Sequence, residues 1–498
     1  MDTQFSRRAV LGALLGSAAT ASWAQAPATS LRPVARPLAA GTITPEMRLG
    51  LADVIAASGV SGRVGVVVSD AKTGAVLESH DAALGLPPAS VTKAVTALYA
   101  MESLGAEFTF ITRLIADGPI KDGVLDGNLI LAGGGDPNLV TDHLADLAAM
   151  LKATGLTAVR GNFYVYDNAL PNLDEIDDSQ LDYLGYNPAV TGLNLNFNRV
   201  HFEWKRTGGT YTVTMDARSA SYRPVVTMAK MRIVDRSSPV FTYRDGGGLD
   251  EWTVARGALG TGGSRWLPVR YPALYAGEVF VGFARSNGLV LTPPTEIAVL
   301  PEGTEIARYR SEDLRRMMRD MLRYSTNITA EAAGMAGTEA RTGQKRGLRT
   351  SALGMTQWTR TRAGIAPMFA DHSGLGDTTR LSAADMVTLL NADGVADVLR
   401  PLLKDIPLRD DNRKVIKDHG AQVVAKTGTL NFVSGLAGFM RTKGGRDLTF
   451  AIFAADLDAR ALGKVSNDEQ PAGSITFNTR AKTLQQQLLR RWAAVNTV

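Results

Sequence analysis

The sequence of 498 residues contains no cysteine, which excludes disulfide bonds and thiol chemistry. Its five histidines are scattered and none belongs to an HExxH motif, so we expect no catalytic metal. A dinucleotide fingerprint and a P-loop are also lacking, since no lysine follows the glycines at 133–135, and we expect no cofactor. No long Lys/Arg cluster occurs, so the net charge of +5 indicates solubility rather than nucleic-acid binding.

Hydrophobic runs long enough to cross a membrane are missing as well. One short apolar run follows the paired arginines at 7–8 and extends to Ala21. This pattern predicts a signal peptide over residues 1–26, of the twin-arginine kind, and then a flexible leader rich in Ala and Pro over 27–44. We therefore expect an exported, periplasmic protein, with a membrane anchor or loose membrane association as the alternative.

Three short motifs follow one another along the chain. They are Ser90-Val91-Thr92-Lys93, Ser325-Thr326-Asn327 and Lys426-Thr427-Gly428. Each motif alone is common and is explained by an ordinary helix cap or strand end. In this order they supply a nucleophile, two proton carriers and an anion-binding strand, which is typical of an acyl-transferring serine enzyme.

The first motif predicts a helix that begins near Ser90. The prolines at 87–88 favour a helix start, and apolar residues then recur at helical spacing. Ser90 and Lys93 are therefore one turn apart on one face. Lys93 can take the proton of the Ser90 hydroxyl only if its pKa is depressed, and we expect burial and the Lys426 cation to do this.

The other two motifs predict the opposite wall of the site. Lys426 lies on a strand of an antiparallel meander, and Gly428 predicts close approach of a substrate peptide added as a further strand. We expect Lys426, Thr427 and Thr429 to hold a terminal carboxylate. Ser325, at a junction between two helices, is expected to relay a proton, and Asn327 to bind the substrate backbone or Lys93.

These motifs and their flanks resemble the penicillin-binding-protein type D-alanyl-D-alanine carboxypeptidases/endopeptidases of the low-molecular-mass class C group. Further stretches carry the likeness: Gly133-Gly134-Gly135-Asp136-Pro137-Asn138-Leu139, Asn187-Pro188-Ala189 with Leu195-Asn196-Phe197-Asn198, and Asp371-His372-Ser373-Gly374-Leu375. The sequence departs from the family at His372, where we expect a structural role, and near Asp377 and Arg380, where the family often has a serine and an arginine beside the pocket for the substrate side chain.

The resemblance implies an α+β fold: a discontinuous penicillin-recognising peptidase domain, built from an antiparallel sheet with helices, with β-rich modules inserted. The stretch between Ser90 and Ser325 is a domain's worth of chain. We expect the peptidase domain to comprise residues 45–110 and 300–498, and residues 111–299 to form one inserted domain or two nested ones.

The expected function is an exported serine D-alanyl-D-alanine carboxypeptidase, with DD-endopeptidase activity as a second option, that acts through an acyl-enzyme on Ser90. Backbone N–H groups of Ser90 and Thr429 would form the oxyanion hole. Expected partners are peptidoglycan peptides ending in D-Ala-D-Ala and β-lactam antibiotics, and the sequence leaves the oligomeric state open. The alternatives are a β-lactamase or esterase on the same site, or a catalytically silent cell-wall-binding protein.

Overall fold

The computed structural model describes residues 48–417, 419–466 and 468–496. The predicted signal peptide (1–26) and leader (27–44) lie outside the described residues. Within the described ranges, no helix combines the length and the apolar character that crossing a membrane requires.

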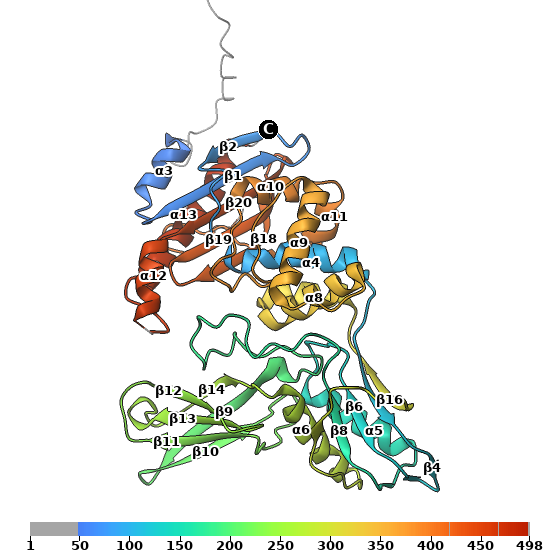
Figure 1. Ribbon diagram of the computed structural model, residues 1–498. Coiled ribbons are helices and arrows are strands. Elements are labelled where there is room, and N and C mark those ends of the chain that lie inside the picture. The colour runs from blue at the N-terminus through green and yellow to red at the C-terminus, as the bar shows by residue number, and fades with distance from the viewer. Residues whose placement is uncertain (1–47, 418, 467, 497–498) are drawn as a thin grey trace, which may run out of the picture. The chain divides into compact units, whose positions relative to one another are not determined.

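A six-stranded antiparallel sheet joins the two ends of the described chain. Its strand order is β17-β18-β19-β20-β1-β2. The strands are β1 (Arg63–Asp70), β2 (Val76–His80), β17 (Lys404–Asp405), β18 (Gln422–Leu430), β19 (Val433–Arg441) and β20 (Asp447–Ala455). The expected antiparallel meander of Lys426 is present as β18, β19 and β20, and β1 pairs with β20 along its whole length (Figure 1).

Both faces of this sheet are covered, because its central strands are apolar on both sides. Every residue of β19 except Arg441 is buried. Val433 and Phe439 belong to one hydrophobic cluster, and Leu436 and Met440 belong to another. Since side chains alternate along a strand, the two clusters lie on opposite faces of the sheet.

Helices supply both covering layers. The Val433 face carries the 3-10 helices η1 (Ala89–Val91) and η4 (Arg400–Leu402) and the helices α4 (Thr92–Leu104), α7 (Leu314–Tyr324), α8 (Asn327–Thr342), α9 (Leu348–Ala363), α10 (Ala383–Leu390) and α11 (Val395–Leu399). The Leu436 face carries α3 (Leu51–Ala57) and α13 (Ser474–Val495), and α12 (Leu457–Val465) follows β20.

A separate hydrophobic core lies in the segment between Ser90 and Ser325. Its five-stranded sheet has the order β15-β8-β6-β3-β16, with β3 (Ile111–Ala116), β6 (Leu129–Ala132), β8 (Phe163–Tyr166), β15 (Thr295–Glu296) and β16 (Thr304–Arg310). Its helices are α5 (Thr141–Ala153), α6 (Pro272–Ser286), η2 (Asn196–Asn198) and η3 (Arg256–Ala258).

Short antiparallel and mixed sheets complete this segment. One contains β9 (Arg199–Thr207), β10 (Thr210–Asp216) and β14 (Gly262–Pro268). Another contains β11 (Ala229–Val234), β12 (Phe241–Asp245) and β13 (Asp250–Ala255), and the smallest contains β4 (Ile120–Lys121), β5 (Val124–Leu125) and β7 (Ala158–Val159). Because β16 pairs with β3, residues 304–310 share the inserted sheet. We therefore propose that the insertion extends to Arg310, beyond the expected end at residue 299.

Substitution of Trp492 tests how far the stability of the six-stranded sheet depends on its packing against α13. Its side chain is fully buried against Phe450, and its indole N–H donates to Glu78 on β2 at 3.0 Å. We expect Trp492→Ala to lower the free energy of unfolding by about 3–5 kcal/mol, because it leaves a cavity and removes one of the hydrogen bonds to Glu78, whose carboxylate keeps those from Arg491. Thermal unfolding is the measurement, with Leu462→Ala at a position 74% exposed as the control. Equal shifts of Tm for the two variants would contradict this role.

Candidate active site

The first two motifs meet at the side chain of Lys93, which is completely buried. Its Nζ lies 3.0 Å from Ser90 Oγ, 2.6 Å from Asn327 Oδ1 and 2.8 Å from the backbone oxygen of Ser373. The structure therefore brings together the predicted Ser90, Lys93 and Asn327, and it adds Ser373, whose part the sequence motifs did not indicate.

Local structure explains the position of Ser90 relative to Lys93. Ser90 lies in the short 3-10 helix η1, which runs directly into α4 at Thr92. The two residues are three positions apart on a helical path, so their side chains project from one face. The predicted apolar stripe is buried, and in fact residues 92–101 of α4 are buried all round.

Burial controls the charge of Lys93. It lowers the pKa of Lys93 to about 8, from an ordinary value of 10.5, although the carboxylates of Glu331 and Asp371 act in the opposite direction. The sequence predicts burial and the Lys426 cation as the causes. Burial is the dominant one, and the charge effects that accompany it at Lys93 come from the two carboxylates.

Glu331 and Asp371 shape the loop that presents the Ser373 oxygen. The carboxylate of Glu331, on α8, accepts the backbone N–H groups of His372 and Ser373, both at 2.9 Å. Asp371 accepts the N–H of Gly374 at 2.6 Å. Burial and the neighbouring Asp371 raise the pKa of Glu331 to about 8, and burial raises that of Asp371. A glutamate within the apolar run of α8 was the sequence signal for this role.

The inserted segment fixes the orientation of the Asn327 amide. Its Nδ2 donates to the backbone oxygen of Tyr186 at 2.7 Å. Since a carbonyl oxygen can only accept, the amide nitrogen must face Tyr186 and Oδ1 must face Lys93. Tyr186 thus acts through its backbone, and no side-chain motif could have revealed it.

A second lysine occupies the wall formed by β18. Lys426 is 1% exposed, and its Nζ donates to Ser325 Oγ at 3.0 Å and to the Thr427 oxygen at 2.7 Å. Burial and the nearby Lys93 lower the pKa of Lys426 well below its usual range. Ser325 ends α7 in a left-handed conformation (φ 63°), which a residue with a Cβ seldom adopts. This turn directs its hydroxyl to Lys426 rather than along the helix.

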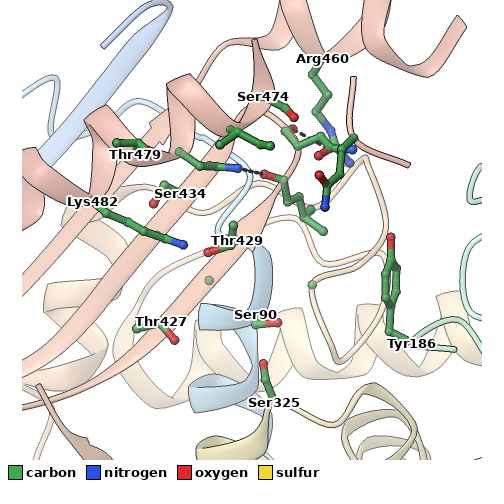
Figure 2. Close-up of a pocket in the computed structure, with 18 of the residues that line it drawn as sticks. Ser90, Tyr186, Ser325, Thr427, Thr429, Ser434, Arg460, Ser474, Thr479 and Lys482 are labelled. Carbon is green, nitrogen blue, oxygen red and sulfur yellow. Dashed lines mark hydrogen bonds between the residues drawn. The ribbon is translucent and has the colours of Figure 1, made fainter. Parts of the chain in front are cut away.

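A cavity of about 850 Å3 opens onto Ser90 and Ser325. Figure 2 shows both hydroxyls beside Thr427 and Thr429, with Tyr186 at one end of the view and Lys482 at the other. The predicted Thr427, Gly428 and Thr429 all line this cavity. Several residues of the segment between Ser90 and Ser325 line it too, namely Ser179, Gln180, Leu181, Leu184 and Tyr186, so this segment and the peptidase segments build the site together.

The backbone that lies closest to Gly428 belongs to the η1 region of this protein. A Cβ at Gly428 would lie 2.5 Å from the oxygen of Pro88 and 3.0 Å from the nitrogen of Ser90. The sequence predicts that a substrate peptide is the close neighbour of Gly428. Instead the glycine lets η1 pack on β18, which sets the nitrogen of Ser90 next to the Thr427–Thr429 edge.

The residues at which the sequence departs from the family, His372, Asp377 and Arg380, all make contacts within the protein. The Asp377 carboxylate is bound by Arg460, at 2.6 Å, and by Lys464, so its negative charge is balanced within the protein. Arg380 donates to backbone oxygens of residues 377 and 379. His372 is fully buried. Its Nε2 forms a hydrogen bond with Ser351 Oγ at 2.7 Å, and its ring stacks on Tyr99.

No group of three metal-binding side chains of the His, Cys, Asp or Glu type comes together among the described residues.

Comparison with known proteins gives the class of this chain. Residues 49–470 match the model of the D-Ala-D-Ala carboxypeptidase 3 (S13) family, and the chain belongs to that family. The predicted family and the prediction of a serine-type carboxypeptidase are thereby confirmed.

Individual relatives agree with this assignment. The D-alanyl-D-alanine carboxypeptidase of Actinomadura sp. (strain R39) is 27% identical over 467 residues, which covers 83% of this chain and 82% of that protein. D-alanyl-D-alanine carboxypeptidase DacB of Haemophilus influenzae is 23% identical over 440 residues, covering 83% and 89%. The crystal structure of penicillin binding protein 4 from H. influenzae superposes with a TM-score of 0.70 at 19% identity, covering 88% of this chain and 99% of that one. The α+β penicillin-recognising fold is confirmed.

The packing of His372 on Gly334 can be tested by a double-mutant cycle. A Cβ at Gly334 would lie 2.2 Å from the Cγ of His372. We expect Gly334→Ala to destabilise the protein by about 1–3 kcal/mol, because the buried ring has no room to move. In the Gly334→Ala/His372→Ala variant the new methyl enters space that the ring has left, so the two costs should not add. Strict additivity of the Tm shifts would contradict the packing.

Proposed function

We propose that this protein is an exported serine D-alanyl-D-alanine peptidase that cleaves peptidoglycan stem peptides through an acyl-enzyme on Ser90. The observation that carries the proposal is the environment of Lys93 Nζ. Two of its three neighbours, Asn327 Oδ1 and the Ser373 oxygen, can only accept hydrogen bonds. A neutral amine has two N–H groups, which these oxygens take, and its lone pair then faces the Ser90 hydroxyl at 3.0 Å.

This arrangement makes Lys93 the general base for acylation. Ser90 O–H donates its proton to the lone pair of Lys93, and Oγ forms a bond to the carbonyl carbon of the scissile amide. Backbone N–H groups of Ser90 and Thr429 would stabilise the negative charge that develops on the carbonyl oxygen. The close packing of η1 on Gly428, where an added Cβ would lie 3.0 Å from the Ser90 nitrogen, supports this pairing.

Departure of the terminal residue needs a proton on its nitrogen. The proton that Lys93 took from Ser90 would reach this nitrogen through the hydroxyl of Ser325 as the C–N bond breaks, which leaves Lys93 neutral again. Ser325 lies 3.0 Å from Lys426 and lines the same cavity as Ser90, which suits it to this relay. Lys426, Thr427 and Thr429 would hold the terminal carboxylate. Water then adds to the acyl carbon, the Ser90 ester bond breaks, and Oγ regains a proton.

The same chemistry accounts for the expected partners. A penicillin would acylate Ser90 by opening its strained amide, and its departing nitrogen would stay attached, which slows the attack of water. Membership of the carboxypeptidase family and the fold shared with a penicillin-binding protein support both the peptide substrate and the β-lactam as ligands. Export to the periplasm fits this substrate, and the expected twin-arginine signal peptide remains part of the proposal.

Covalent labelling tests the nucleophile. We expect Ser90→Ala to abolish labelling by a fluorescent penicillin, since Ser90 is the hydroxyl that the Lys93 amine contacts, at 3.0 Å. Ser286→Ala, which changes a hydroxyl at the end of α6, serves as the control and should label as the parent does. Persistent labelling of Ser90→Ala would overturn the assignment, and rapid release of the label from the parent would favour a β-lactamase.

The pH dependence of acylation tests the base. A general base works only when it is deprotonated, so the rate should rise with pH through the pKa of Lys93. Because burial places that pKa at about 8, we expect the rate to rise about tenfold per pH unit below pH 7 and to level off above pH 9. Stopped-flow acylation by a penicillin measures this profile. A rising limb centred near 10.5, the ordinary lysine value, would contradict a buried neutral base.

A further inference from the structure

The active-site cavity continues past the edge of β18. On one side β18 pairs with β19 along its length, whereas on the other it pairs with β17 only at Val424 and Ala425. Residues 426–430 therefore have an edge with no strand partner in the described part of the chain. The cavity that contains Ser90 passes this edge and reaches Lys482 on α13, which Figure 2 shows on the side away from Tyr186.

The two parts of the cavity lie against opposite faces of β18. Lys426 and Gly428 face Ser325 and the backbone of Ser90. The alternation of the strand turns Thr429 to the other face, where its neighbour across the ladder is Ser434. The hydroxyl of Ser434 accepts a hydrogen bond from Gln485 Nε2 of α13 at 3.1 Å. We call the part of the cavity between Thr429 and α13 the α13 branch.

Positive charge dominates the α13 branch. Arg409, Arg413 and Lys482 line it, and the acidic group among them is Asp410. The Asp410 carboxylate accepts the backbone N–H of Lys414 at 2.8 Å, and Arg409 donates to the Arg413 oxygen at 2.8 Å.

Lys482 is exposed and forms no hydrogen bond or ion pair with another residue that the structure describes. The cavity's further acidic residues are Asp468 and Glu469. Glu469 pairs with Arg265 at 3.0 Å, and its backbone oxygen accepts from Asn431. The ammonium of Lys482 is thus available to a ligand.

We propose that the α13 branch binds a second carboxylate, carried by the part of the substrate that departs with the amine, with Lys482 as the main contact. The inference rests on the proposed function, in which Thr427 and Thr429 hold the carboxylate of the departing residue. A group beyond that carboxylate enters the α13 branch, because the branch begins at Thr429. D-Alanine has no such group, whereas the departing half of a cross-link between two acidic stem peptides does. The branch therefore favours cross-linked substrates, and with them DD-endopeptidase activity.

Three acyl-dipeptide substrates that differ only in the departing residue test whether its side-chain carboxylate is recognised. All share one acyl-D-Ala half, and the departing residue is D-Ala, D-Glu or the neutral isostere D-Gln. For the parent protein we expect a higher kcat/KM with D-Glu than with D-Gln. We expect Lys482→Gln to lower the D-Glu to D-Gln ratio by about twofold to fivefold at low salt, the range of an exposed ion pair. Added salt should reduce the preference of the parent in the same way.

Two further variants sharpen the test. Lys482→Glu should reverse the preference, so that a departing D-Lys is cleaved faster than D-Glu. Arg480→Gln removes a cation two positions away on α13 whose guanidinium donates to the Gly59 oxygen and which does not line the cavity, and it should keep the parent ratio. If Arg480→Gln lowers the D-Glu to D-Gln ratio as much as Lys482→Gln does, the inference is overturned, because the overall positive potential of this surface would then explain the preference.

The outcomes separate this inference from the proposed function. Cleavage of all three substrates at one rate by the parent overturns the role of Lys482 and leaves the Ser90 chemistry in place. Absence of cleavage and of penicillin labelling overturns both.

Discussion

The structure of the site depends on the burial of one amine. Lys93 is enclosed completely, and a charged ammonium at such a position is costly unless every N–H has a partner. Asn327 Oδ1 and the Ser373 oxygen satisfy two N–H groups, and Ser90 Oγ faces the third direction. Burial therefore does two things at once: it lowers the pKa of Lys93 to about 8, and it leaves the neutral amine with its lone pair toward the nucleophile.

Holding this amine requires contributions from distant parts of the chain. η1 carries Ser90, α4 carries Lys93, α8 carries Asn327 and Glu331, and the loop after α9 supplies Ser373. The inserted segment takes part as well, because the oxygen of Tyr186 fixes which way the Asn327 amide points. The insertion is thus tied to the reaction geometry at the level of a single hydrogen bond.

The sequence predicted the parts of the site that reside in side chains of characteristic type and order. Hydrogen bonds join Lys93 to Ser90 and Asn327, and Lys426 to Ser325. Ser90, Ser325 and Asn327 line one cavity with Thr427 and Thr429. What it did not predict resides in the backbone or in long-range pairing. The contacts of Ser373 and Tyr186 use backbone oxygens, which every residue type has, and the neighbour of Gly428 proved to be η1. The pairing of β16 with β3, on which the proposed end of the insertion at Arg310 rests, joins segments far apart in the sequence. Such contacts follow from three-dimensional packing, which a local pattern does not encode.

The most direct measurement of the central claim is the titration of Lys93 itself. Lysine labelled with 13C at Cε reports the ionisation of each amine by its chemical shift, and the signal missing from Lys93→Arg identifies Lys93. The account predicts a midpoint near pH 8 for this signal in the free protein, where no substrate or antibiotic contributes. A midpoint in the ordinary range near 10.5 would show that the amine beside Ser90 is a charged ammonium at neutral pH, and the proposed base would be lost.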